Sequence, residues 1–190
     1  DPILKKNNCT VDMWKTGHSH MKRRVRELNS ISGFEKSGHF FINHPLGLGF
    51  DDGLMSAILV AKLLDEKKGS SLSEIKKSLP ITYQSPTMAP YCADDEKYQV
   101  VDEMIEKINS MFLNKDSVIN QKIKNIFTVN GVRFELENGS WGLIRASSNK
   151  PSLVIVIESL ESNDEVIKIF NFVNSLLETT GKVGKYDQSI

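Results

Sequence analysis

The stretch from Gly33 to His39 holds residue types that could bind a sugar. In an extended chain alternate side chains share a face, so Glu35, Ser37 and His39 would point in one direction. A carboxylate can accept hydrogen bonds from two neighbouring hydroxyls, and a serine hydroxyl can donate or accept. These residues suit the edge of a sugar, although on alternation alone a polar strand face with one packed histidine is the more ordinary interpretation.

A second polar group runs from Arg145 to Pro151, between two strand-like segments. The guanidinium of arginine is a planar fork that matches phosphate. Ser147, Ser148 and Asn149 add neutral donors, and successive amides of a loop can surround an anion. A polar turn closed by proline is the alternative. An arginine at a strand end followed by three short polar residues favours anion binding.

The segment from Lys15 to His20 precedes a helical pattern. A lysine and histidines at a helix N-terminus could face an anion, whereas an ordinary cap by Thr16 or Ser19 is the alternative. The pair Asp51-Asp52 is better explained as a helix cap than as metal ligands, because no third ligand is apparent. We expect no metal site in this chain.

The composition gives no support to nucleic acid or a membrane as the main partner. The 190 residues carry 24 basic and 24 acidic side chains, so the formal net charge is zero. No apolar run is long enough to span a bilayer. Cys9 and Cys92 are expected to be free, buried thiols in a reducing cytoplasm. The chain opens without methionine or a signal peptide, which favours a piece of a longer or processed product.

The first half of the chain is predicted to be an incomplete α/β unit. Capping residues, helical spacing and glycines define its elements. They are a weak strand over Thr10–Trp14, a helix over His18–Leu28, a turn and extended stretch over Ile31–Phe41, a buried helix over Leu54–Leu64 after the Asp51-Asp52 cap, and a short helix opened by a capping box at Ser71–Glu74.

The second half predicts a small α+β domain with a four-stranded antiparallel sheet and two helices. Pro86 and Pro90 mark the linker into it, and Asn130-Gly131 is a strong hairpin signal. We place the boundary between residues 1–82 and 83–190. The expected elements are a helix capped by Asp94 and Asp95, strands over Ile126–Val129, Val132–Leu136, Trp141–Ala146 and Leu153–Ile157, and a helix opened by a capping box at Ser162–Glu165.

Four segments in order resemble the α-D-phosphohexomutase superfamily, and within it the phosphomannomutase/phosphoglucomutase group. They are Trp14–Ser19, Glu35–Phe41, Gly49–Leu54 and Gly142–Ser147. The resemblance covers nearly the whole chain, as the end of the family's third domain and its TBP-like fourth domain. Four motifs in the right order are far more specific than any one of them.

The resemblance implies an enzyme that interconverts hexose 1-phosphate and 6-phosphate. A phosphoserine in the first domain gives its phosphate to the sugar, glucose or mannose 1,6-bisphosphate is the intermediate and activator, and a second-domain loop binds Mg²⁺. By the same resemblance, Glu35 and Ser37 would read sugar hydroxyls, and the histidines would serve catalysis. These are His39, near the hydroxyl to be phosphorylated, and His18, which contacts the ligand. The phosphate that is not transferred would be held by Arg145, Ser147, Ser148 and Asn149, with Lys15 as a further substrate contact.

The chain also departs from the family pattern. Phe34 stands where the family has glycine, and the loop donors Ser148 and Asn149 are shifted relative to the usual Arg-Ala-Ser-Asn-Thr. Segments like Thr-Ala-Ser-His-Asn-Pro and Asp-Gly-Asp-Gly-Asp-Arg are absent from the sequence, as is the family's upstream third-domain lysine.

The resemblance implies that the parent protein is a mutase, and these absences imply that this chain alone is inactive. It would act together with the remaining N-terminal domains of that protein. The alternatives are a stand-alone phosphosugar-binding module, or a fragment of a phosphoglucosamine mutase. The usual Ser-Gly-Thr-Glu-Pro loop of the latter is absent here.

Overall fold

The computed structural model describes residues 4, 6–188 and 190, and the chain divides into two compact units. The units are Asp1–Pro80 and Ile81–Ile190. The break falls two residues before the boundary expected from the sequence. That it separates a third from a fourth domain stays a prediction.

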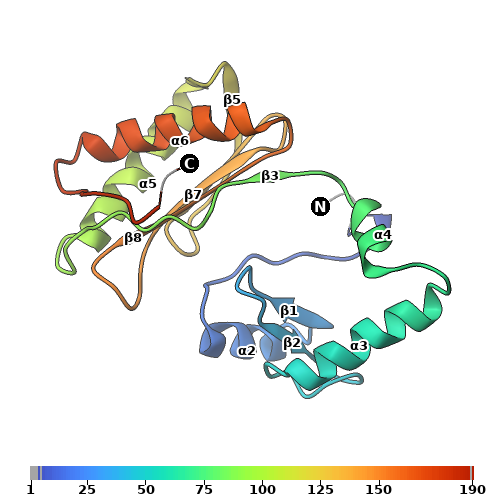
Figure 1. Ribbon diagram of the computed structural model, residues 1–190. Coiled ribbons are helices and arrows are strands. Elements are labelled where there is room, and N and C mark those ends of the chain that lie inside the picture. Colours follow the sequence, from blue (N-terminus) through green and yellow to red (C-terminus); the bar gives the residue numbers. More distant parts are fainter. Residues whose placement is uncertain (1–3, 5, 189) are drawn as a thin grey trace. The chain divides into compact units, whose positions relative to one another are not determined.

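The first unit contains the helices α2, α3 and α4 and a two-stranded sheet (Figure 1). Strands β1 and β2 pair antiparallel, with Gly33 opposite Phe41. A Cβ at Gly33 would lie 2.7 Å from Val25 of α2, so glycine allows this helix to pack closely on the hairpin. The elements are α2 (His18–Glu27), β1 (Ser32–Phe34), β2 (Phe40–Ile42), α3 (Gly53–Glu66) and α4 (Leu72–Lys77).

Local capping signals in this unit are confirmed. The Asp52 carboxylate accepts a hydrogen bond from the Met55 amide at 3.0 Å and so caps α3. Ser71 and Glu74 form a complete capping box at the start of α4. These interactions depend on residues three apart, which is why the sequence alone reveals them.

Two expectations for the first unit are wrong. Residues 10–14 form no strand. Helix α3 was expected to be buried, yet none of its residues is buried, and Leu54 is 74% exposed. The many apolar residues of α3 are typical of a helix that packs on a sheet. The only sheet among the described residues of this unit is the short β1–β2 hairpin.

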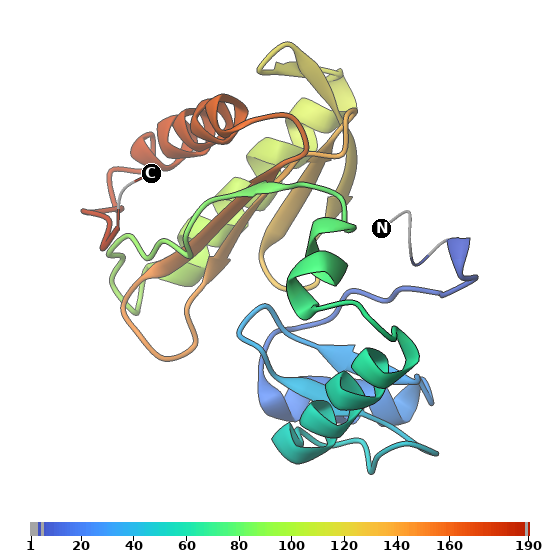
Figure 2. The same cartoon turned by 45° about the vertical axis from the view of Figure 1, so that its right-hand side comes forward.

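The second unit is a six-stranded antiparallel sheet with two long helices, α5 and α6 (Figure 2). The strand order is β3-β8-β7-β6-β5-β4. The expected four-stranded sheet is confirmed as β5 to β8, and two-residue strands extend both edges. The elements are β3 (Tyr83–Gln84), α5 (Lys97–Asn114), β4 (Ser117–Val118), β5 (Gln121–Phe127), β6 (Val132–Leu136), β7 (Trp141–Ala146), β8 (Leu153–Ser159) and α6 (Asn163–Glu178).

The core of this unit joins both helices to the strands. Phe134 of β6, Ile155 of β8, Met104 of α5 and Ile169 of α6 are all fully buried in one cluster. A Cβ at Gly142 would lie 2.6 Å from the Phe134 ring, so this position in β7 needs glycine for the ring to pack against the strand. The core therefore holds β7, and the polar loop that follows it, in a fixed place.

The Asn130-Gly131 hairpin is confirmed between β5 and β6, with Phe127 opposite Arg133. Strand β5, however, begins at Gln121 rather than near Ile126. Its first half alternates polar residues with Ile123 and therefore lacks an apolar run. Helix α5 begins at Lys97 after Glu96, and no side chain caps it, so the expected Asp94-Asp95 cap is wrong.

Helix α6 starts as expected, because the Ser162 hydroxyl accepts from the Glu165 amide at 3.2 Å. Only this half of the capping box is seen, since the Glu165 carboxylate turns to other partners. Both cysteines are free as expected, but Cys9 is exposed and only Cys92 is buried. Burial raises the pKa of the Cys92 thiol. In the part of the chain that the structure describes, no helix is long and apolar enough to cross a membrane.

Candidate functional site

The Gly33–His39 motif spans the end of β1 and the tight turn that connects it to β2. The Glu35 amide donates to the His39 carbonyl at 3.0 Å, and the Gly38 amide donates to the Glu35 carbonyl at 2.9 Å. Gly38 has a φ of +90°, which favours glycine. The expectation that Glu35, Ser37 and His39 alternate along an extended strand is therefore wrong. They are grouped instead by a turn, with Ser37 exposed within it.

Glu35 joins this turn to the start of α2. One of its carboxylate oxygens, Oε1, accepts a hydrogen bond from the Gly17 amide at 2.5 Å. Gly17 directly precedes His18, the first residue of α2, and Lys15 lies exposed two residues before Gly17. A single carboxylate thus connects two motifs that are eighteen residues apart in the sequence.

Asp51 brings the two candidate catalytic histidines together. Its Oδ2 lies 2.7 Å from Nδ1 of His39 and 3.9 Å from Nε2 of His18, and its Oδ1 accepts from the Phe40 amide at 3.2 Å. The hydrogen bond with His39, supported by the Phe40 amide, lowers the pKa of the Asp51 carboxyl. The His18 and His39 side chains are each about half exposed, at 54% and 48%, so both remain open to a ligand.

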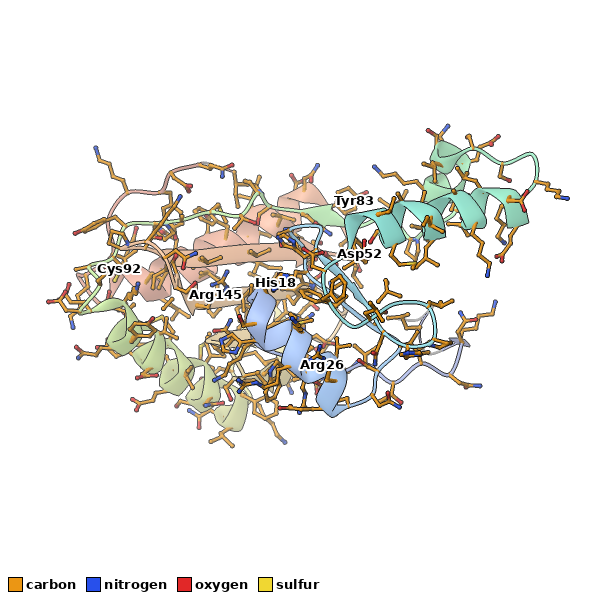
Figure 3. All side chains as sticks on the ribbon, turned by 90° about the horizontal axis from the view of Figure 1, so that it is seen from below. His18, Arg26, Asp52, Tyr83, Cys92 and Arg145 are labelled. Carbon is orange, nitrogen blue, oxygen red and sulfur yellow. The ribbon has the colours of Figure 1, made fainter. Side chains whose placement is uncertain are left out.

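The role of Asp51 could not be predicted from its neighbours in the sequence. The sequence predicts a helix cap for both aspartates, but only Asp52 has the spacing for it, and Figure 3 marks Asp52 ahead of α3. The partner of Asp51, His39, is twelve residues away, beyond the reach of a capping pattern.

The Arg145–Pro151 segment comprises the end of β7 and most of the closed loop that joins β7 to β8. Arg145 is the second-last residue of β7 (Figure 3), and its guanidinium Nη1 donates to the Ala146 carbonyl at 3.2 Å. The Ser147 amide donates to the Ser152 carbonyl at 3.0 Å, which closes the base of the loop. The tip residues, Ser148 and Asn149, are exposed.

Ser147 organises the inside of this loop. Its Oγ accepts hydrogen bonds from the amides of Asn149 at 3.4 Å and Lys150 at 3.2 Å. A hydroxyl has one proton to donate and two lone pairs. Because amides engage both lone pairs, the Ser147 hydroxyl can still donate its proton to an acceptor such as a phosphate oxygen.

The candidate residues fall into two sets, one in each unit. The first unit carries Lys15, His18, Glu35, Ser37 and His39, of which the two histidines lie next to Asp51. The second unit carries Arg145 near the end of β7 and Ser147, Ser148 and Asn149 in the loop that follows. Among the residues that the structure describes, no group of three or more His, Cys, Asp or Glu side chains is arranged to hold a metal ion.

Comparison with known proteins places this chain in a family. Residues 1–83 match the family model for "Phosphoglucomutase/phosphomannomutase, alpha/beta/alpha domain III". A phosphomannomutase/phosphoglucomutase of Pseudomonas putida is 32% identical over 168 residues, which are 88% of this chain and 33% of the relative. The chain belongs to the α-D-phosphohexomutase superfamily. It spans about a third of the length of the curated relatives it matches.

Other members of this superfamily extend the match along the chain. A phosphomannomutase/phosphoglucomutase of Pseudomonas aeruginosa is 31% identical over 83% of the chain and 31% of the relative, and a phosphoglucomutase of Neisseria meningitidis is 27% identical over 94% of the chain and 36% of the relative. A crystal structure of a phosphoglucomutase/phosphomannomutase family protein from Burkholderia thailandensis matches 98% of this chain and 41% of that one, with a TM-score of 0.73 and 22% identity. That structural likeness supports the fold.

Proposed function

We propose that this chain is the C-terminal part of a phosphohexomutase of the phosphomannomutase/phosphoglucomutase type. In this proposal the first unit reads the sugar and the second unit holds the phosphate that is not transferred. The observation that carries it is the Asp51 carboxylate between His18 and His39, next to the Glu35 turn. Family membership and the relatives' names support the same reaction, the interconversion of hexose 1-phosphate and hexose 6-phosphate.

Glu35 and Ser37 are assigned to the sugar hydroxyls. Oε1 of Glu35 is engaged by Gly17, whereas its second oxygen can accept from a hydroxyl. The exposed Ser37 side chain lies two residues further along the same turn. The turn therefore offers one charged acceptor and one hydroxyl for neighbouring sugar oxygens, with Lys15 as an additional contact.

His39 is assigned to proton transfer. Asp51 binds Nδ1 of His39, which leaves Nε2 to face a substrate. When a sugar hydroxyl attacks the phosphorus of a phosphoserine, an oxygen–phosphorus bond forms to the sugar and the one to the serine breaks. The hydroxyl proton passes to Nε2 of His39, the serine oxygen takes up a proton from solvent as its bond to phosphorus breaks, and both transfers run backwards in the reverse step. His18, which shares the Asp51 carboxylate, contacts the same ligand.

The phosphoserine and Mg²⁺ of this reaction are assigned to parts of the protein outside this chain. When bound, Mg²⁺ supplies charge stabilisation to the phosphoryl group that is transferred. The described residues of this chain offer no group of three ligands that fits the ion. The other domains of the same protein are the expected partners, and a reducing cytoplasm fits the two free cysteines.

The phosphate that is not transferred is assigned to the Arg145–Asn149 loop. The guanidinium, the Ser147 hydroxyl proton and the exposed side chains of Ser148 and Asn149 are all donors. A dianionic phosphate has enough acceptor oxygens to use them together. An unphosphorylated sugar lacks the charge that the guanidinium recognises.

Titration of this chain with glucose 1-phosphate, mannose 1-phosphate and free glucose, followed by NMR, tests the assignment. The phosphosugars should bind at about millimolar level and shift the amides of Ser147 to Asn149. Free glucose should leave those amides in place at the same concentrations. Equal shifts with glucose and the phosphosugars, or none in the loop, would overturn the proposed phosphate site.

A further inference from the structure

Lys97 is a buried lysine next to the candidate phosphate loop, and the proposed function does not use it. Its side chain is only 5% exposed, which is rare for lysine unless the charge is paired. The ammonium donates to Asp94 Oδ1 at 2.6 Å and to the Lys150 carbonyl at 3.1 Å. Asp94 is 69% exposed, so the counterion lies largely in solvent while the cation is inside.

The Lys150 carbonyl belongs to the C-terminal side of the phosphate loop. It also accepts from the Ser152 amide at 2.8 Å, and the neighbouring Pro151 carbonyl accepts from the Cys92 amide at 3.1 Å. The segment that leads into α5, together with Lys97, therefore donates hydrogen bonds to two successive carbonyls on this side of the loop. Of these contacts, the one from Lys97 is the only charged one, and hydrogen bonds from charged groups are the stronger kind.

The start of α5 does not need this ammonium. The Lys97 amide donates to Ala93 at 2.9 Å and the Val100 amide donates to Glu96 at 2.9 Å, so backbone hydrogen bonds define the first turn. An apolar side chain of similar length could fill the same buried volume. The buried ammonium of Lys97 is therefore better explained by its contact with the Lys150 carbonyl than by a need of helix α5.

We propose that Lys97 is a positioning residue for the phosphate-binding loop. A loop that binds an anion must keep its carbonyl oxygens away from that anion and its donors toward it. Lys97 fixes the Lys150 carbonyl, while the Asn149 and Lys150 amides stay on the Ser147 hydroxyl. The buried positive charge also favours an anion nearby. This inference rests on the proposed function, because it assumes that the loop binds the phosphate of a hexose phosphate.

Lys97→Met in the full 190-residue chain tests the proposal. Titrated with glucose 1-phosphate, the variant should bind about tenfold more weakly. In its ligand-free spectrum, the amides of Ser148 to Lys150 should shift, while core amides such as those of Phe134 and Ile155 stay in place. Lys107→Met is the matched control, because this lysine lies on the same helix and donates to Thr179 instead. It should bind glucose 1-phosphate like the wild type.

The outcomes separate this inference from the proposed function. Wild-type affinity in Lys97→Met would overturn the positioning role and leave the phosphate site intact. If the wild-type loop does not respond to glucose 1-phosphate, both ideas fail. Should Lys97→Met not fold, Asp94→Asn decides. This variant keeps the ammonium on the Lys150 carbonyl and removes its counterion, so glucose 1-phosphate should bind at least as tightly as to the wild type, and a tenfold loss would contradict the proposal.

Discussion

At the scale of single residues, carboxylates arrange the proposed sugar site. Glu35 ties the hairpin turn to the loop before α2, and Asp51 holds the ring of His39. Each does so from a position that the backbone fixes, since Asp51 also accepts from the Phe40 amide. The proposed ligand contacts are therefore set in place before a sugar arrives, which limits the ordering that binding requires.

Asp51→Asn should impair turnover more than substrate binding in the intact enzyme. The amide keeps the size of the side chain but removes the charge that orients His39 and stabilises its protonated form during proton transfer. We expect kcat to fall by about 10²-fold or more, within the range that a general base contributes, while KM changes little. Steady-state kinetics with glucose 1-phosphate measures both. An unchanged kcat would exclude His39 as the base in this geometry.

Glu35→Ala should weaken glucose and mannose phosphates alike. Loss of a hydrogen bond to a charged group costs about 1.5–3 kcal/mol, and the turn would also lose its link to Gly17. Binding of both sugars to the intact enzyme, followed by calorimetry, gives the two losses directly. If one sugar bound as before, Glu35 would not bind the hydroxyls that both sugars share, contrary to what we propose.

Arg145→Lys should raise KM more than it lowers kcat in the intact enzyme. Lysine keeps the charge but loses the planar fork that binds two phosphate oxygens in parallel. The phosphate held here is the one that does not react, so its contacts are similar in the ground and transition states. A modest fall in kcat is expected because a loosened phosphate misaligns the sugar. A fall in kcat with an unchanged KM would contradict this role.

At the scale of elements, a buried polar cluster joins α6 to the end of the sheet opposite the phosphate loop. The Glu165 carboxylate accepts from Gln121 at 2.8 Å, Asn138 at 2.9 Å and Ser140 at 2.7 Å, and also from Ser159. Burial by itself would raise the pKa of Glu165, but these hydrogen bonds together lower it. Glu165 thus fastens the helix to β5, β8 and the β6–β7 connection.

The stability of the second unit should therefore fall in acid through Glu165. A carboxyl with a lowered folded pKa stabilises the fold above its unfolded pKa of about 4.3, and that stabilisation is lost as the pH falls through the folded pKa. Glu165→Gln should cost about 1–3 kcal/mol at neutral pH and flatten the acid dependence. Urea unfolding from pH 3 to 7 measures both effects. The exposed Glu161→Gln is the control and should match the wild type.

At the scale of the whole molecule, the two units differ in how far their helices are buried. The second unit buries a continuous core, whereas α3 of the first unit has no buried residue. The family model that matches this region describes an alpha/beta/alpha domain, a sheet between helical layers. Only the β1–β2 hairpin supplies strands among the described residues of this unit. We therefore expect other residues of the parent protein to cover α3.

Leu54→Gln should reveal this difference. In the 190-residue chain Leu54 is 74% exposed, so the change should alter the free energy of unfolding by less than about 0.5 kcal/mol. In the intact protein the same change should cost about 1.5–3 kcal/mol if the side chain is buried there. Chemical denaturation of both forms gives the comparison, with Glu66→Gln on the same helix as a neutral control. Equal small effects in both would mean that α3 stays uncovered.

Features that depend on neighbours in the chain could be predicted from the sequence alone. The helix starts at Asp52, Ser71 and Ser162 follow from hydrogen bonds between residues three apart, and the Asn130-Gly131 turn follows from its own backbone preferences. The order of motifs also sufficed for the family. The caps, the turn and each single motif are contained within a few consecutive residues, and the order of the motifs is written in the chain itself, so none of them required information about packing.

Contacts between groups that are distant in the chain could not be predicted from the sequence, because packing sets them. Asp51 pairs with His39 across twelve residues, Glu165 draws partners from as far as forty-four residues away, and Lys97 reaches a carbonyl fifty-three residues on. Whether α3 is covered is likewise a property of its surroundings and not of its apolar pattern. A side chain's type states what it can bind, but its partner is set by the packing of elements that are far apart in the chain.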